Sequence, residues 1–316
     1  MTANTILLLD PFGTVEQVEA ALGTDAGHFR VVRADRPDGD GVFALMVGPE
    51  TPVSAEEIAA LPDLRIVAVT STGFDHIPIE AVTAGGGWVT TAAGYCTDEV
   101  AEHALALLLA GLRGIPALDT SVRAGVWDVT AIRPRRIAGS SVGLVGFGRI
   151  AQALARRLVA LDVSVRAYDP ITPPEAYVKL GVERAGSAAE AMAGADAVSL
   201  HVPLTDGTRG MLDAEAFAGL APGTFLVNVA RGELVDPVAL AEAIRSGRLS
   251  GAGLDVFATE PLPMDDPLRQ LPGVLLGPHG AWYSSGAEAR LFTMATASIL
   301  DVFHGRRPAG AVAAPH

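Results

Sequence analysis

Residues 141–151 read Ser-Val-Gly-Leu-Val-Gly-Phe-Gly-Arg-Ile-Ala, an apolar run that leads into a glycine-rich turn. The apolar part is typical of a buried strand, and the residues after the turn are spaced as in a helix. Gly146 and Gly148 fill the first two positions of a G-x-G-x-x-G/A pattern, and Ala151 fills the third, where alanine is permitted. The next strand is predicted to end at Asp169, about 20 residues further along. This order of strand, turn, helix, strand and acid is that of a dinucleotide-binding unit.

The residue types in this unit suit one kind of dinucleotide. Gly146 permits a tight turn, Gly148 lets the backbone approach a pyrophosphate, and the helix N-terminus supplies amides and the positive end of a dipole. Asp169 would accept hydrogen bonds from the adenosine ribose, and Pro170 and Ile171 behind it offer nothing to a 2'-phosphate. The pattern therefore predicts NAD rather than NADP, the alternative being a tight turn that binds no ligand.

On both sides of this unit, short β-rich runs alternate with helical patterns, as in parallel sheets covered by helices. Before the unit we predict helices over residues 15–22 and 56–61, and strands over residues 5–10, 29–34, 42–48 and 65–72. From the unit onward six strands are predicted, over residues 141–145, 163–169, 197–202, 224–230, 251–257 and 274–277. Six strands with intervening helices make a full doubly wound sheet, the Rossmann arrangement.

Two long helical patterns divide the chain. Residues 97–113 form a mostly apolar pattern that opens with a threonine cap and acids in the first turn, and we predict a hinge helix there. Residues 285–304 follow the last strand and are expected to cross back to the first domain. The predicted fold class is α/β with two doubly wound parallel-sheet domains. A discontinuous substrate domain covers residues 1–96 and 286–316, and a Rossmann NAD-binding domain covers residues 97–285.

Composition narrows the possible partners. The chain has 316 residues, 49% of them hydrophobic, which is enough for two domains with separate cores. Its formal charge of -13 works against binding to nucleic acid or anionic lipid.

Cys96 is the only cysteine, which excludes an intrachain disulfide. His76, His103 and His201 lack metal-ligand spacing, so no metal site is expected. His103 is interpreted as a helix residue near the hinge or in a subunit contact. We find no leader pattern and no apolar run of membrane-spanning length, which predicts a cytoplasmic protein.

Three later segments each place an ionisable residue just after a predicted strand. They are Asn-Val-Ala-Arg-Gly at 228–232, Asp-Val-Phe-Ala-Thr-Glu-Pro at 255–261 and Gly-Pro-His-Gly-Ala-Trp at 277–282. The carboxyl ends of strands line the ligand crevice of a doubly wound sheet, so all three segments are expected near one cofactor.

These motifs, in this order and spacing, resemble the D-isomer-specific 2-hydroxyacid dehydrogenase family over nearly the whole chain. The resemblance implies a homodimeric, NAD-dependent oxidoreductase that transfers a hydride between NAD(H) and C2 of a small 2-hydroxy or 2-keto acid. It places the family's catalytic residues at Arg231, Glu260 and His279. It also implies that Asp255 holds the nicotinamide carboxamide, and that the cofactor is lined by Arg149, Ile150, Val202 and Ala230.

The proposed chemistry suits these residue types. A guanidinium at Arg231 can bind a carboxylate and polarise the adjacent ketone. Histidine is the side chain best tuned to give a proton near neutral pH, which suits His279, and a carboxylate at Glu260 would fix its tautomer and favour imidazolium. Taken singly, each residue also fits a plainer role: a loop-capping arginine, a solvated turn acid and a buried hydrogen-bonding histidine.

Two further segments extend the resemblance to a substrate pocket. Residues 94–99 and 279–284 are similar to the branch that contains C-terminal-binding protein and its bacterial relatives, in which the tryptophan, here Trp282, borders the pocket. Gly280 replaces a more usual alanine there. Ser71, Thr72 and Gly73 resemble the family loop whose amides grip the substrate carboxylate, and Thr72 would also face the cofactor. An ordinary strand-to-helix turn is the alternative for this loop.

Other functions remain open on the same fold. One is a dehydrogenase of formate, phosphite or a phosphonate, although formate dehydrogenases carry glutamine where Glu260 stands and phosphite dehydrogenases carry lysine near Thr72. Another is an NAD-sensing binding protein, as the corepressor resemblance suggests. A purely structural subunit is a third possibility. The intact set of arginine, glutamate and histidine favours catalysis over the last two.

Overall fold

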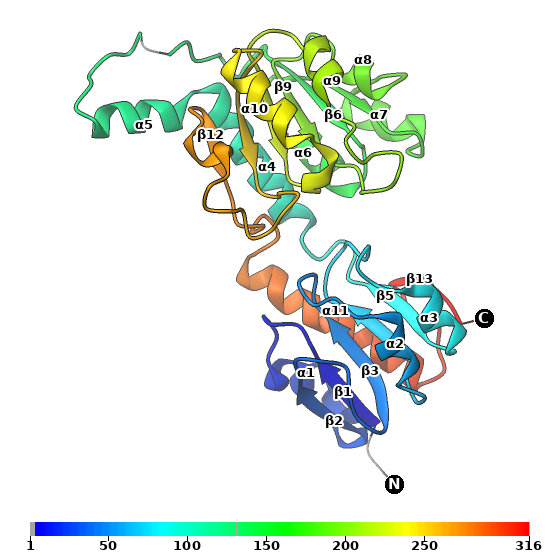
Figure 1. The fold of residues 1–316 in the computed structure, drawn as a ribbon. Coiled ribbons are helices and arrows are strands. Elements are labelled where there is room, and N and C mark those ends of the chain that lie inside the picture. The colour runs from blue at the N-terminus through cyan, green and yellow to red at the C-terminus, as the bar shows by residue number, and fades with distance from the viewer. Residues whose placement is uncertain (1–3, 131, 316) are drawn as a thin grey trace. The chain divides into compact units, whose positions relative to one another are not determined.

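The structure, a computed structural model, describes residues 4–130 and 132–315, and the chain divides into two compact units (Figure 1). Unit 1 contains residues 1–96 and 283–316, and unit 2 contains residues 97–282. The prediction placed the return to the first unit at residue 286. Each unit is built on its own sheet, so each is described by itself below.

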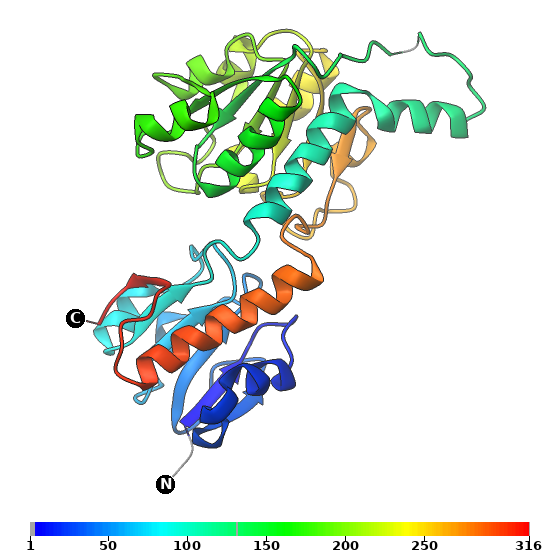
Figure 2. The same cartoon turned by 180° about the vertical axis from the view of Figure 1, so that it is seen from behind.

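Unit 1 contains a six-stranded sheet in the order β13-β5-β4-β3-β1-β2. All neighbours are parallel except β13, which pairs antiparallel with β5. The strands are β1 (Asn4–Leu8), β2 (Phe29–Arg33), β3 (Val42–Val47), β4 (Ile66–Val69), β5 (Trp88–Thr91) and β13 (Ala311–Ala313). The helices are α1 (Val15–Leu22), the 3-10 turn η1 (Gly23–His28), α2 (Ala55–Ala59), α3 (Ile79–Ala84) and α11 (Ser285–Phe303). Ile58 of α2 and Val82 of α3 are buried against Leu45 and Val67 of the sheet, and α11 lies beside α1 (Figure 2).

Unit 2 contains a seven-stranded, all-parallel sheet in the order β12-β11-β10-β9-β6-β7-β8. The strands are β6 (Ser141–Val145), β7 (Ser164–Tyr168), β8 (Glu183–Arg184), β9 (Ala197–Leu200), β10 (Thr224–Asn228), β11 (Leu249–Leu254) and β12 (Val274–Leu276). The helices are α4 (Thr97–Leu112), α5 (Ile115–Arg123), α6 (Arg149–Ala160), α7 (Pro174–Leu180), α8 (Ala188–Met192), α9 (Ala214–Gly219) and α10 (Pro237–Arg245), with 3-10 turns η2 (Gly232–Leu234) and η3 (Pro267–Gln270). The fold class predicted from the sequence is confirmed.

Successive side chains of the strands in unit 2 enter opposite cores, as a parallel sheet covered on both faces requires. On β10, Phe225 and Val227 join the core beneath α4 and α6, whereas Leu226 joins the core beneath α9 and α10. Glycine allows α4 to lie close to the sheet. A Cβ at Gly111 would collide with the Phe225 ring, and a Cβ at Gly253 would lie 2.9 Å from Cβ of Leu107.

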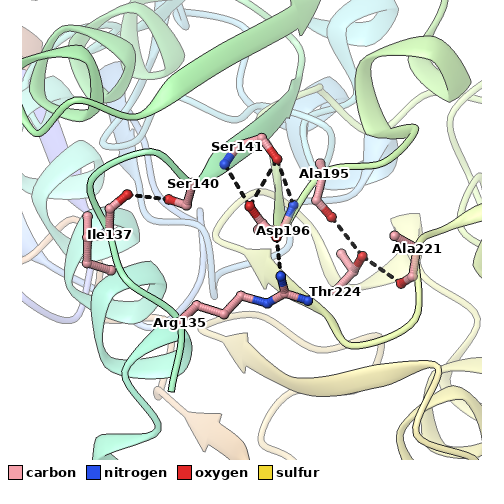
Figure 3. A network of polar contacts seen from close by, with 8 residues as sticks. All are labelled: Arg135, Ile137, Ser140, Ser141, Ala195, Asp196, Ala221 and Thr224. Carbon is pink, nitrogen blue, oxygen red and sulfur yellow. Dashed lines mark hydrogen bonds and ion pairs between the residues drawn. The ribbon is translucent and has the colours of Figure 1, made fainter. Parts of the chain in front are cut away.

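A polar network fixes the amino edge of this sheet (Figure 3). The Asp196 carboxylate accepts hydrogen bonds from the Arg135 guanidinium and, at 2.9 Å, from the Ser141 backbone amide. Thr224 donates its hydroxyl to the carbonyl of Ala195 at 2.9 Å. Ligands bind at the opposite, carboxyl edge of such sheets, so this network anchors the chain where it returns from α5.

Strands β5, β8 and β13 lie outside the sequence prediction, as does α5. β8 is two residues long with both side chains exposed, so it carries no apolar alternation. β13 consists of only three residues, Ala-Val-Ala, which follow the last predicted helix. Within the described residues no single helix is long and apolar enough to cross a membrane, although α4 and α5, bent by 60° at their junction, pass a length and composition test as a pair.

Candidate active site

Three loops meet at the carboxyl edge of the sheet in unit 2, where β10, β11 and β12 end. Asn228, the buried last residue of β10, accepts the Ala230 amide at 3.0 Å and donates its side-chain amide to the Arg231 carbonyl at 2.8 Å. These bonds fix the turn that carries Arg231. The next residue must be small, since a Cβ at Gly232 would collide with the backbone of Phe257. The loops after β10 and β11 therefore touch backbone to backbone.

Glu260 and His279, predicted as partners, form a hydrogen-bonded pair. Nδ1 of His279 lies 2.7 Å from Oε2 of Glu260, and the other carboxylate oxygen accepts the Phe257 amide at 2.8 Å. Each side chain of the pair is 36% exposed. Because Nδ1 is directed at the carboxylate, Nε2 is the ring nitrogen left to exchange a proton with another molecule.

The pair also shifts its own protonation. The hydrogen bond that His279 donates to Glu260 raises the pKa of His279 above its ordinary value, and this outweighs burial and the positive charge of Arg231, which act in the opposite direction. Burial acts to raise the pKa of Glu260, but the His279 hydrogen bond and the Phe257 amide outweigh it, and that pKa is lowered. Arg231 is close enough to lower the pKa of both groups. The arrangement favours a carboxylate beside an imidazolium.

Asp255 holds the backbone around His279. His279 adopts a positive φ of 57°, which is uncommon for a residue with a side chain. Its amide donates to the Asp255 carbonyl at 2.8 Å, and the Asp255 carboxylate accepts the amides of Gly280 at 3.1 Å and Ala281 at 2.7 Å. A Cβ at Gly277 would collide with this carboxylate. Asp255 is thus an anchor of the loop that presents His279.

The glycine turn after β6 has the geometry that a dinucleotide needs. Gly146 has a φ of 90°, and a Cβ there would lie 2.6 Å from the carbonyl oxygen of His201. Gly148 is exposed, has no atom within 4 Å of an added Cβ, and begins the 12-residue helix α6 without a side-chain cap. The first amides of such a helix lack intrahelical partners, so an anionic group fits here.

Asp169 follows β7 directly and is already engaged by backbone amides. It accepts those of Phe147, Ile171 and Thr172 at 2.8–2.9 Å. Burial acts to raise the pKa of Asp169, but these hydrogen bonds outweigh it, so the pKa is lowered and the group remains a carboxylate. A carboxylate has about four acceptor positions, more than the three that these amides occupy.

The other predicted cofactor residues surround the same edge. Arg149 is exposed in the first turn of α6, and Ile150 beside it is half-buried against the core beneath that helix. Val202 and Ala230 follow β9 and β10 and are half-buried against the other core.

The predicted substrate loop lies in unit 1, just after β4. Ser71 is buried and donates its hydroxyl to the Gly73 carbonyl at 2.6 Å, and Thr72 is exposed. Trp282, half-buried, is the last residue of unit 2. It precedes α11, whose N-cap is Ser284.

Some features at this edge were not predicted as part of the site. His103 on α4 lies with Nε2 3.7 Å from Oδ1 of Asp255, a proximity that no sequence motif signals. The His201 ring is hydrogen-bonded to the Ser199 hydroxyl at 2.9 Å, and burial lowers the pKa of His201 to about 4.

A cavity of about 100 Å³ lies behind the Glu260 loop. Its lining includes Asn228, Gly232 and Phe257, but not the three predicted catalytic side chains. Among the described residues, no three His, Cys, Asp or Glu side chains are grouped to hold a metal ion.

Comparison with known proteins identifies the family. Residues 105–281 match the model for "D-isomer specific 2-hydroxyacid dehydrogenase, NAD binding domain". The chain is 44% identical to D-3-phosphoglycerate dehydrogenase of Mycobacterium leprae over 83% of this chain and 49% of that protein. It is 42% identical to (S)-sulfolactate dehydrogenase of Chromohalobacter salexigens over 80% of this chain and 82% of the relative. A crystal structure of a Thermus thermophilus protein superposes with a TM-score of 0.87 at 33% identity, covering 98% of this chain and 100% of that one.

The chain therefore belongs to the D-isomer specific 2-hydroxyacid dehydrogenase family, as predicted. Because the matched region is the family's NAD-binding domain, NAD as the cofactor is also confirmed. The chain spans about half the length of the mycobacterial phosphoglycerate dehydrogenase that it matches. The comparisons do not show the corepressor branch, so the similarity to that branch stays a prediction.

Proposed function

We propose that this chain is an NAD-dependent D-2-hydroxyacid dehydrogenase that transfers a hydride between NAD(H) and C2 of a small 2-hydroxy or 2-keto acid. The observation that carries the proposal is the His279–Glu260 pair, whose Nδ1–Oε2 distance is 2.7 Å and whose imidazole has a raised pKa. A raised pKa increases the fraction of imidazolium at near-neutral pH, and the imidazolium form has a proton to give. Family membership supports the same reaction class.

Three side chains share the work in this proposal. Arg231 binds the substrate carboxylate and polarises the C2 carbonyl through its guanidinium, which stabilises the negative charge that develops on oxygen. His279 donates the Nε2 proton to that oxygen, and Glu260 holds the ring by Nδ1 and stabilises the imidazolium before transfer. Bound NADH supplies the hydride that reaches C2. In the oxidation direction His279 accepts the hydroxyl proton and Arg231 keeps the acid in place.

The cofactor is proposed to lie along the carboxyl edge of unit 2. Gly146 and Gly148 leave room for its pyrophosphate at the start of α6, and the Asp169 carboxylate accepts from the adenosine ribose. Asp255 is proposed to contact the nicotinamide carboxamide. The residues proposed to line the rest of the cofactor are Thr72, Arg149, Ile150, Val202 and Ala230.

For the substrate we propose contacts from the amides of Ser71, Thr72 and Gly73 to its carboxylate, and from the Trp282 ring to its side chain. The named relatives act on D-3-phosphoglycerate and (S)-sulfolactate, according to their names. A substrate panel for this chain must therefore include acids with a second anionic group beside those with apolar side chains.

We propose further that the protein is a cytoplasmic homodimer that binds neither nucleic acid nor membrane. The absence of binding to nucleic acid or membrane is in keeping with its net charge of -13.

Support for the dimer comes from α5, none of whose residues is buried, and from the segment after it, in which Trp127 is 88% exposed. Apolar side chains gathered on one segment mark an interaction surface. A second copy is the proposed occupant, and light scattering of Trp127→Ser should report more monomer than wild type.

The proposal is tested by following NADH oxidation at 340 nm over 2-keto acids of graded size and charge. His279→Gln should lower kcat by about 10²–10⁴-fold, the usual contribution of general acid catalysis, and leave the Kd for NADH within about threefold. Arg245→Gln, an exposed charge on α10, is the matched control and should behave as wild type. NADH binding without turnover of any keto acid would favour an NAD-sensing protein and contradict the proposal.

A further inference from the structure

The register of α4 on the sheet brings His103 to the end of β11. Leu107 packs directly on Gly253, where a Cβ would approach to 2.9 Å. From this contact, four residues toward the start of α4 cover about 6 Å, and two residues toward the end of β11 cover about the same distance. His103 and Asp255 occupy those two positions. The packing of α4 on β11 therefore also places the His103 ring beside the Asp255 carboxylate.

The observed contact agrees with that register. Nε2 of His103 lies 3.7 Å from Oδ1 of Asp255, which is a close contact but too long for a hydrogen bond. Asp255 is 1% exposed, and Nε2 of His103 is a buried atom without a hydrogen-bond partner in the described part of the chain. A buried carboxylate needs compensating donors or positive charge, and a buried ring nitrogen needs a partner. The buried ring nitrogen and the buried carboxylate therefore face each other at 3.7 Å.

The His103 ring faces the Asp255 carboxylate, and Asp255 in turn holds the backbone around His279. Its two oxygens accept the amides of Gly280 and Ala281, and its own carbonyl accepts the His279 amide. The left-handed backbone of His279 therefore depends on where Asp255 stands. A shift of that carboxylate would move the imidazole relative to Glu260.

We propose that His103 is a positioning residue for His279, acting through Asp255, an inference that rests on the proposed function. The ring presents Nε2 to Oδ1 and confines the carboxylate. The sequence of contacts is His103 to Asp255, Asp255 to the amides flanking His279, and His279 to Glu260. All of it lies within unit 2.

The test is a double-mutant cycle on the full chain with the best keto acid from the panel. His103→Leu should lower kcat about tenfold while KM and the Kd for NADH change less than about threefold, since the loss falls on the proton donor. His103→Gln, whose amide nitrogen reaches the place of Nε2, should restore kcat to within about threefold. In an Asp255→Asn background, His103→Leu should have less than about a twofold further effect.

Two further variants serve as controls for this test. Glu102→Gln changes the neighbouring residue on α4, whose partner Arg157 keeps its bond to Asp98, and should leave kcat unchanged. If thermal denaturation shows His103→Leu to be unfolded, His103→Asn replaces it, because its shorter side chain cannot reach Asp255.

Wild-type kcat in His103→Leu, or an undiminished loss in the Asp255→Asn background, would overturn the role of His103 while the dehydrogenase stands. A wild-type chain that reduces no keto acid would overturn both.

Discussion

Replacing Glu260 by glutamine should change the pH profile of keto-acid reduction in a defined direction. Glutamine keeps the size of the side chain and one carbonyl oxygen, but loses the charge that faces Nδ1 of His279 at 2.7 Å. Because a hydrogen bond to Glu260 raises the pKa of His279, the variant should have a lower one. The active protonated form is complete below this pKa and is lost as pH rises through it, so the alkaline limb should move to lower pH.

The size of the shift follows from the geometry. Two unit charges 4 Å apart interact by about 1 kcal/mol in water and about 4 kcal/mol at an effective dielectric of 20. With both side chains 36% exposed, solvent screening places the pair near the lower value, and we expect about 1.4 kcal/mol, or one pKa unit. At a pH above both pKa values the variant should be about tenfold slower than wild type, and below both it should approach the wild-type rate.

The assay is kcat/KM against pH, with Glu242→Gln on α10 as the charge-matched control. A uniform loss at every pH with an unmoved alkaline limb would contradict the electrostatic role of Glu260, because it would leave Glu260 a structural role alone.

Three further outcomes are expected. NADH should exceed NADPH in kcat/KM by at least about tenfold, since Asp169 repels a 2'-phosphate, and equal use of both would contradict this. Medium apolar keto acids such as 4-methylthio-2-oxobutyrate should be turned over better than glyoxylate, and Trp282→Ala should lose that preference; an unchanged ranking with a lower Tm would make Trp282 a packing residue. Gly111→Ala should lower stability by about 1–3 kcal/mol in denaturant unfolding because its Cβ meets the Phe225 ring, whereas Gly219→Ala, with open space around it, should not.

Much of the fold followed from local patterns in the sequence. The strand at residues 141–145 and the helix at residues 15–22 have their predicted bounds, because apolar alternation, a cap and a glycine turn mark their ends within a few residues. The elements that we did not predict lack such local signals in the sequence. β13 pairs with β5 through backbone bonds far apart in sequence, and α5 is a nine-residue helix with none of its residues buried.

The site divides in the same way. Arg231, Glu260 and His279 stand in motifs at strand ends, so sequence alone named them as candidates, and the hydrogen bond between Glu260 and His279 is a finding of the structure. His103 could not be found from sequence, because its position beside Asp255 depends on how closely α4 packs at Gly253. The three amide bonds to Asp169 likewise belong to a turn that only coordinates define.

The fate of a labelled hydride tests directly whether this chain transfers a hydride to C2 of a 2-keto acid. The wild-type chain is incubated with NADH deuterated at C4 of the nicotinamide and a 2-keto acid from the panel, and the product is examined by mass spectrometry and chiral separation. We expect one deuterium on C2 of a D-2-hydroxy acid, with formation of that product lost in His279→Gln. NADH that binds but delivers no deuterium to any 2-keto acid would contradict it.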